Sequence, residues 1–136
     1  MKPPDTVRRE LVAQWIARAE EDLGVAQYLL AERLPYYSAI GFHAQQAAEK
    51  FVKAFLVAHQ VEFPKIHDLG RLLDLVASVD VGLAEDLAGA VQLTDYGVDV
   101  RYPGDLPQLT ATDAEEAVDC ADHVRKGIRR RLELAP

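Results

Sequence analysis

The sequence predicts an all-α fold, an up-and-down bundle of four or five helices in a single domain that spans residues 1–136. Apolar residues recur every three or four positions in successive segments, as they do on the buried face of a helix. No segment shows the sustained two-residue alternation of β-branched residues that is typical of strands. Of the 136 residues, 49% are hydrophobic, which is enough to build one core.

The first two helices are expected to form an antiparallel hairpin. Asp5 or Thr6 can cap a first helix that ends near Arg33. Its apolar stripe steps alternately by four and three residues: Val12, Ile16, Ala19, Leu23, Ala26 and Leu30. Pro35 disfavours helical geometry before it, and a second helix then runs from about Tyr36 to His59. Because the link is short, the two helices should lie side by side.

The second helix is the element around which we expect the others to pack. Its apolar residues cover more than half of the helical wheel: Ile40, Ala44, Ala47, Ala48, Phe51, Val52, Phe55, Leu56 and Ala58. The remaining arc carries one polar stripe made of His43, Gln46, Lys50 and Lys53, with Glu49 at its edge. One helix therefore supplies both the core and a cationic, hydrogen-bonding surface.

Two shorter helices and a loop are expected next. Asp68 can cap a helix that continues to Val79, and a fourth apolar stripe spans about Leu83 to Thr94. From Gly97 to Leu109 the chain contains two glycines and two prolines, which predicts an irregular loop.

The last helix is predicted to begin at a capping box formed by Thr112 and Glu115 and to continue to about Leu132. Its apolar stripe again has helical spacing: Ala114, Ala117, Ala121, Val124, Ile128 and Leu132. Three consecutive arginines at 129–131 lie near its C-terminal end, where cations complement the helix dipole.

The charge balance limits the classes of partner. The formal net charge is −7 and the pI is about 5.0, so the whole-molecule field repels nucleic acid and acidic membrane surfaces. Any contact with RNA or a nucleotide must be local. The single cysteine, Cys120, excludes an internal disulfide and is expected to be a small buried residue. No stretch resembles a signal peptide or a membrane span, so we expect a cytoplasmic protein.

The polar stripe is the first candidate site. Its lysines could hold a phosphate, because cationic side chains on an otherwise buried helix should face a groove or a partner. The alternative is a solvated helix face in which Glu49 and Lys53 form an ordinary ion pair one turn apart.

Two further candidates lie after the central helix. His67 stands at a helix entrance, where free amides also attract anions, whereas the adjacent Asp68 is assigned the cap. In the following loop, Tyr96, Arg101 and Tyr102 could grip a phosphate and stack a base. Alternatively, Arg101 forms a salt bridge within the loop that simply holds it in place. No metal site is expected, because the histidines do not form a Glu-x-x-His or His-x-x-x-His pattern.

Four stretches together resemble the HEPN family, the higher eukaryote and prokaryote nucleotide-binding domains. The stretches are the W-x-x-x-A-x-x-D-L start (Trp15, Ala19, Asp22, Leu23), FHAQQAAEKFVKAFL (Phe42 to Leu56), IHDLGRLL (Ile66 to Leu73) and RYPGD (Arg101 to Asp105). The resemblance covers roughly Leu11 to Leu132. It implies a helical bundle that usually dimerises, and a common pairing with a minimal nucleotidyltransferase as a toxin–antitoxin couple.

The resemblance also implies a test for enzymatic activity. Many HEPN members are metal-independent ribonucleases that use an arginine, four to six arbitrary residues and then a histidine. Here the permitted positions after Arg101 hold Leu106, Pro107 and Gln108, and no other arginine has a histidine at that distance. The chain is therefore not expected to be a typical HEPN ribonuclease.

Three hypotheses follow. The leading one is a homodimeric HEPN module that binds a nucleotide such as ATP or GTP, or a nucleotidyltransferase partner, and requires no cofactor. Its ligand-binding residues would be Gln46, Lys50, Lys53, His67, Tyr96, Arg101 and Tyr102. The second is a ribonuclease toxin with an altered site, in which His67 or His43 replaces the missing histidine beside Arg101. The third is a structural protein whose polar stripe is a dimer surface.

Overall fold

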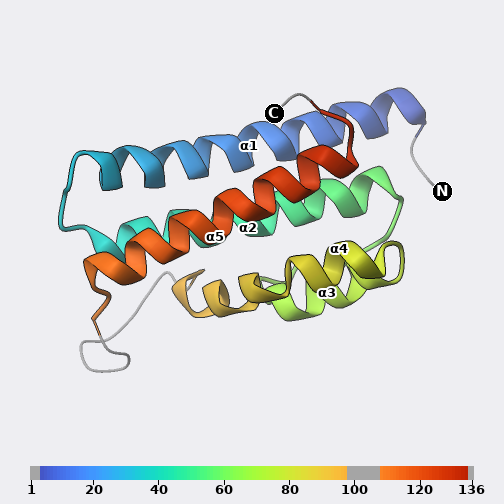
Figure 1. Ribbon diagram of the computed structural model, residues 1–136. Helices are drawn as coiled ribbons and strands as arrows, with labels where there is room; N and C mark the ends of the chain where they lie inside the picture. Colours follow the sequence, from blue (N-terminus) through green and yellow to red (C-terminus); the bar gives the residue numbers. More distant parts are fainter. Residues whose placement is uncertain (1–3, 98–107, 135–136) are drawn as a thin grey trace.

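The computed structural model describes residues 4–97 and 108–134, and this part of the chain is built from helices packed side by side (Figure 1). The elements are α1 (Asp5–Ala31), α2 (Tyr37–Ala58), α3 (Leu69–Ala77), α4 (Val81–Asp86), the 3-10 helix η1 (Ala88–Gly97) and α5 (Ala111–Arg131). The described residues contain no strand, so the all-α prediction is confirmed. None of the helices among them is long and apolar enough to cross a bilayer.

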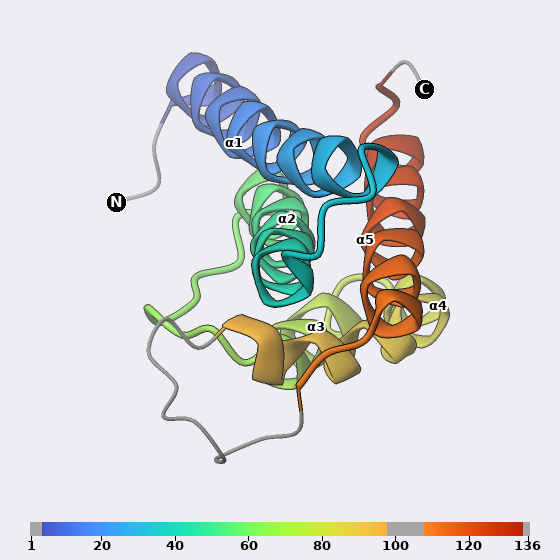
Figure 2. The same ribbon diagram turned by 90° about the vertical axis from the view of Figure 1, so that its left-hand side faces the viewer.

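Helix α2 is the centre of the bundle. Figure 2 shows α1, α5 and the layer formed by α3 and η1 packed against three sides of α2. More than half of its residues are buried, including Phe51 and Phe55, which are at most 1% exposed. Burying a phenylalanine side chain contributes about 2–3 kcal/mol. The wide apolar arc predicted for this helix is thus explained by neighbours on several sides.

The α1–α2 hairpin forms as predicted, but its start differs. Pro4, not Asp5 or Thr6, occupies the cap position of α1, and no side chain caps this end. The proline fits because its fixed φ is compatible with a helix start and its missing N–H would have had no intrahelical partner. Asp5 lies in the first turn instead, where its carboxylate pairs with Arg8 at 2.8 Å.

In the middle of the chain, the structure confirms one predicted helix cap and corrects one predicted helix. Asp68 accepts hydrogen bonds from two backbone amides at the start of α3, as predicted. The single helix expected over Leu83 to Thr94 is instead two elements, α4 and η1. The reason lies in the spacing of Leu87, Ala90 and Leu93, which recur every three residues, the period of a 3-10 helix.

Helix α5 begins two residues earlier than expected. The capping box predicted for Thr112 and Glu115 is wrong, because Thr110 and Asp113 form it. The Thr110 hydroxyl accepts from the Asp113 amide at 3.2 Å, and the Asp113 carboxylate accepts from the Thr110 amide at 2.8 Å. Aspartate takes the place of the usual glutamate at the third helical position, so the earlier threonine can start the helix.

Asp80 ties the start of α4 to the end of α5. Its carboxylate accepts from the Leu83 amide at 2.9 Å and from Arg131 Nε at 2.8 Å. The Leu83 hydrogen bond and then the Arg131 hydrogen bond lower the pKa of Asp80 below its ordinary value of 3.8.

We predict that Asp80→Asn destabilises the protein near neutral pH and that the difference disappears in acid. A carboxyl group whose pKa is lowered by folding stabilises the native state above its ordinary pKa, and this contribution is lost as the pH falls through the lowered value. Asparagine keeps an oxygen for the cap but loses the charge that attracts Arg131. Urea unfolding at neutral pH and at the lowest pH at which the protein stays folded measures the effect, with the exposed change Asp74→Asn as control. An equal destabilisation at both pH values would contradict it.

Candidate functional site

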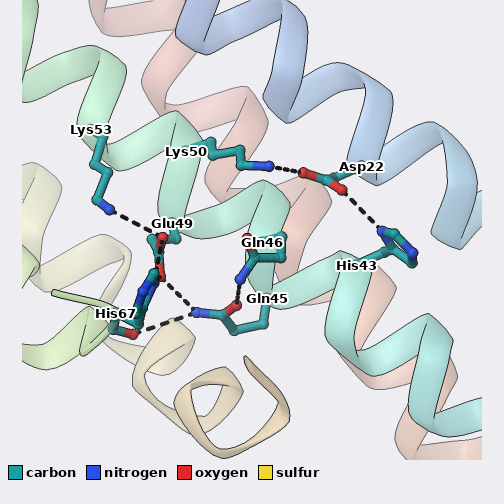
Figure 3. A network of polar contacts seen from close by, with 8 residues as sticks. All are labelled: Asp22, His43, Gln45, Gln46, Glu49, Lys50, Lys53 and His67. Atoms are coloured by element: carbon teal, nitrogen blue, oxygen red, sulfur yellow. Dashed lines mark hydrogen bonds and ion pairs between the residues drawn. The ribbon is translucent and has the colours of Figure 1, made fainter. Parts of the chain in front are cut away.

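The candidate site is organised around the Glu49 carboxylate, which lies on α2 and is only 2% exposed (Figure 3). Oε1 accepts from Gln45 Nε2 at 3.0 Å, and Oε2 accepts from Lys53 Nζ at 3.1 Å. His67 Nδ1 lies 3.0 Å from Oε1 and 3.1 Å from Oε2. Burying a carboxylate is costly unless it is paired and hydrogen-bonded, and here three side chains meet that requirement.

Lys53 is buried nearly as deeply as its partner. Its ammonium group lies 5.6 Å from the centre of the Trp15 ring and 5.7 Å from that of Phe63. The two rings pack edge to face, with their centres 6.4 Å apart. Trp15 comes from α1 and Phe63 from the segment between α2 and α3, so one lysine joins three parts of the chain through an ion pair and cation–π contacts.

His67 is the exposed member of the cluster. Its side chain is 73% exposed although its Nδ1 contacts the buried Glu49 carboxylate. The Gln45 carboxamide also donates to the His67 backbone carbonyl, at 3.4 Å. Both the ring and the backbone of His67 are therefore tied to α2, which leaves the other ring nitrogen, Nε2, as the atom available to a ligand.

The end of η1 lies against the same cluster. A Cβ added at Gly97 would stand 2.6 Å from the carboxamide carbon of Gln45, so a larger residue at position 97 would force the buried Gln45 side chain to shift. The Tyr96 ring and the Leu109 side chain both pack against Gly41 on α2. The described residues on either side of the stretch 98–107 thus contact α2 within about one turn of each other.

A second polar cluster joins α2 to α1. Asp22 of α1 accepts from Lys50 Nζ at 2.5 Å and contacts His43 Nδ1 at 2.9 Å. All three side chains are half-buried or nearly buried. Gln46, which donates to the Gln45 carboxamide oxygen at 2.7 Å, lies between the two clusters (Figure 3).

Comparison with known proteins identifies the family. A profile of the HEPN domain matches residues 12–131 of the chain. The chain belongs to the HEPN family. A Methanocaldococcus jannaschii protein, MJ1304, which is named as a candidate toxin, is 30% identical over an alignment of 129 positions that covers 85% of this chain and 84% of that protein.

Two solved structures have the same fold. TT1696 from Thermus thermophilus superposes with a TM-score of 0.71 at 32% identity, and ST0689, an archaeal HEPN homologue, with a TM-score of 0.67 at 28% identity. Each comparison covers 88% of this chain and 96% of the other. The HEPN resemblance predicted from the sequence is confirmed.

The structure divides the predicted stripe of this HEPN chain into two clusters. His43 and Lys50 contact Asp22, whereas Lys53 contacts Glu49. Both lysines thus pair with carboxylates of the same chain. The Glu49–Lys53 pair given above as the alternative to a phosphate site does form, but it is buried rather than solvated. Tyr96 is half-buried, while Arg101 and Tyr102 lie outside the described residues.

Sequence reasoning missed the two side chains on which the site depends most. Gln45 was not singled out, and Glu49 was placed only at the edge of the stripe. The available signal was a glutamine and a glutamate one turn apart within the apolar surface of α2, since buried polar side chains need partners. Asp22 could not be assigned to Lys50 from spacing, because the two residues belong to different helices.

The other candidate sites within the described residues give less support for a chemical function. They contain no group of three or more histidine, cysteine, aspartate or glutamate side chains arranged to hold a metal ion. Burial raises the pKa of the Cys120 thiol, which disfavours the reactive thiolate. A cavity of about 660 Å³ lies between α1 and the end of α5, and the two polar clusters contribute nothing to its lining.

We predict that Lys53→Met costs about 3 kcal/mol of stability, because it leaves the Glu49 carboxylate buried without its ion-pair partner. Lys50→Met is the matched control: it removes a lysine from the same helix whose pair with Asp22 is more exposed, and it should cost about 1 kcal/mol or less. Urea unfolding measures both. Equal losses of unfolding free energy for the two variants would show that burial does not make the Glu49–Lys53 pair more important for stability than the Asp22–Lys50 pair.

Proposed function

We propose that this chain is the HEPN component of a toxin–antitoxin type pair, that its partner is a minimal nucleotidyltransferase, and that it binds a nucleotide at the face where His67 lies. The family membership and the relative that is named as a candidate toxin support the first part. The chain would act as a homodimer, the arrangement that the family resemblance implies.

The observation that carries the nucleotide proposal is the exposed imidazole of His67 fixed by a buried carboxylate. A side chain that is 73% exposed would normally sample several rotamers, but here Nδ1 is held by Glu49 at 3.0 Å. A ligand can therefore meet Nε2 in a preset orientation, with less ordering entropy to lose on binding. We assign a further ligand contact to Gln46 of α2, whose amide donates to the Gln45 oxygen in the same network.

The remaining contacts are assigned to the end of η1 and to the stretch between η1 and α5. Gly97 and Leu109, on either side of that stretch, contact α2 at Gln45 and Gly41. We assign the phosphate contact to Arg101 and base stacking to Tyr96 and Tyr102.

The two lysines take a smaller part in this proposal than the sequence suggested. Lys53 is buried against Glu49 and two rings, so it orders the site rather than contacting the ligand. Lys50 is 22% exposed in its side chain and pairs with Asp22, so its charge is largely compensated. A phosphate bound here would rely on Arg101 and would gain only long-range attraction from Lys50.

We predict that calorimetric titration with ATP and GTP gives measurable binding to the wild-type chain and at least tenfold weaker binding to His67→Ala. The matched control is His123→Ala, which removes an exposed histidine on α5 whose ring contacts Asp86. The absence of heat with either nucleotide, or an equal loss for both variants, would refute the proposal. The partner is tested separately, by co-purification of the chain with a tagged minimal nucleotidyltransferase.

A second function is favoured by one specific feature, the pairing of an exposed imidazole with a carboxylate at hydrogen-bond distance. In this arrangement the imidazole acts as a general base, and the carboxylate that accepts its other N–H sets the orientation of the ring. In this alternative, His67 cleaves RNA without a metal ion and replaces the histidine missing from the usual HEPN motif.

We predict for this alternative that purified protein cleaves RNA in the presence of EDTA and that His67→Ala abolishes cleavage, because the proton acceptor is removed. His43→Ala is the comparison, since His43 also contacts a carboxylate but on the α1 side of α2. Cleavage that survives in the His67→Ala, His43→Ala double variant would rule out both histidines as the proton acceptor.

A further inference from the structure

We propose that Glu49 is a positioning residue that holds His67 in the tautomer with hydrogen on Nδ1, so that the group bound at Nε2 is a hydrogen-bond donor. The inference rests on the nucleotide-binding function proposed above and adds the chemistry of the contact. At neutral Nε2 the ligand offers a ribose hydroxyl or an N–H group of a base, not a phosphate oxygen.

The tautomer follows from the donors around Glu49. Gln45 Nε2 donates to Oε1 and Lys53 Nζ donates to Oε2, and neither nitrogen can accept a hydrogen bond. Both carboxylate oxygens are therefore acceptors. His67 Nδ1 lies within 3.1 Å of both, so it must carry the hydrogen in this contact. The neutral ring then has its lone pair on Nε2.

The orientation of the ring is fixed from several directions. The Gln45 carboxamide holds the Glu49 carboxylate and the His67 carbonyl at once. Gly97 packs against Gln45, and Trp15 and Phe63 lie beside Lys53. Because Gln45 and Lys53 are both buried, the Glu49 carboxylate cannot rotate without breaking buried contacts.

The competing explanation is that Glu49 only neutralises Lys53. In that case the contact with His67 is incidental, and the tautomer of His67 does not depend on residue 49. A readout of the ring itself, compared between the wild-type protein and variants at residue 49 without ligand, separates the two explanations.

The experiment is long-range 1H–15N correlation spectroscopy of histidine-labelled protein without ligand, near pH 8. We expect His67 with hydrogen on Nδ1 and a bare Nε2. His123 is an internal control with the opposite tautomer, because its Nε2 can only donate to the Asp86 carbonyl, 3.2 Å away. Hydrogen on Nε2 of His67 in the wild-type protein would overturn the inference.

Two double variants extend the test without leaving an unpaired buried charge. Glu49→Gln with Lys53→Met keeps an acceptor oxygen at residue 49 and should preserve the tautomer. Glu49→Leu with Lys53→Met removes the acceptor, and His67 should shift to the form with hydrogen on Nε2. An unchanged tautomer in the leucine variant would contradict a positioning role. If that variant does not fold, the wild-type spectrum is the deciding readout, because hydrogen on Nε2 of His67 there would overturn the inference.

Binding of adenosine, which has hydroxyl and amino donors but no phosphate, supplies the second readout. We expect about tenfold weaker binding to the leucine double variant than to the glutamine double variant, a loss of about 1.4 kcal/mol. If the tautomer is as expected but neither adenosine nor ATP binds, the proposed function fails while the positioning role stands. If both double variants bind adenosine equally, the donor chemistry assigned to this contact is wrong.

Discussion

The rest of the structure depends on one buried carboxylate on the central helix. A charge at the position of Glu49 is tolerated only if nearby groups replace the water it has lost, and an uncompensated one costs several kcal/mol. Lys53, Gln45 and His67 meet this need. Lys53 also contacts the rings of Trp15 on α1 and Phe63 in the linker, and Glu49 contacts His67 just before α3. The ion pair therefore connects these three parts of the chain to α2. Packing and site geometry are thus consequences of the same constraint.

Most of the fold could be predicted from the sequence because the apolar spacing of α1, α2 and α5 follows the period of an α-helix over many turns. The errors lie where two local signals compete. Thr110 and Thr112 each precede an acidic residue by three positions, and spacing alone cannot decide which threonine caps α5. The change from α4 to η1 depends on a three-residue period that resembles a helical stripe when read over only a few residues.

The site was predicted less completely than the fold, for a physical reason. Sequence periodicity shows which side chains share a face of α2, but their partners come from other elements. Asp22 reaches Lys50 from α1, and His67 reaches Glu49 across the linker that follows α2. The prediction that the residues of the polar stripe lie along one face of α2 was therefore correct. The partners of the two lysines could be identified only from the packed bundle.

The most direct test of this account is a double-mutant cycle between Glu49 and Lys53, measured by urea unfolding of Glu49→Leu, Lys53→Met and the two combined. The account predicts that the double variant is more stable than Lys53→Met alone, because replacing both charges with apolar groups leaves neither buried and unpaired, and that the coupling is about 2–3 kcal/mol. Additive losses, with a coupling near zero, would contradict the claim that the buried ion pair organises the bundle and its site.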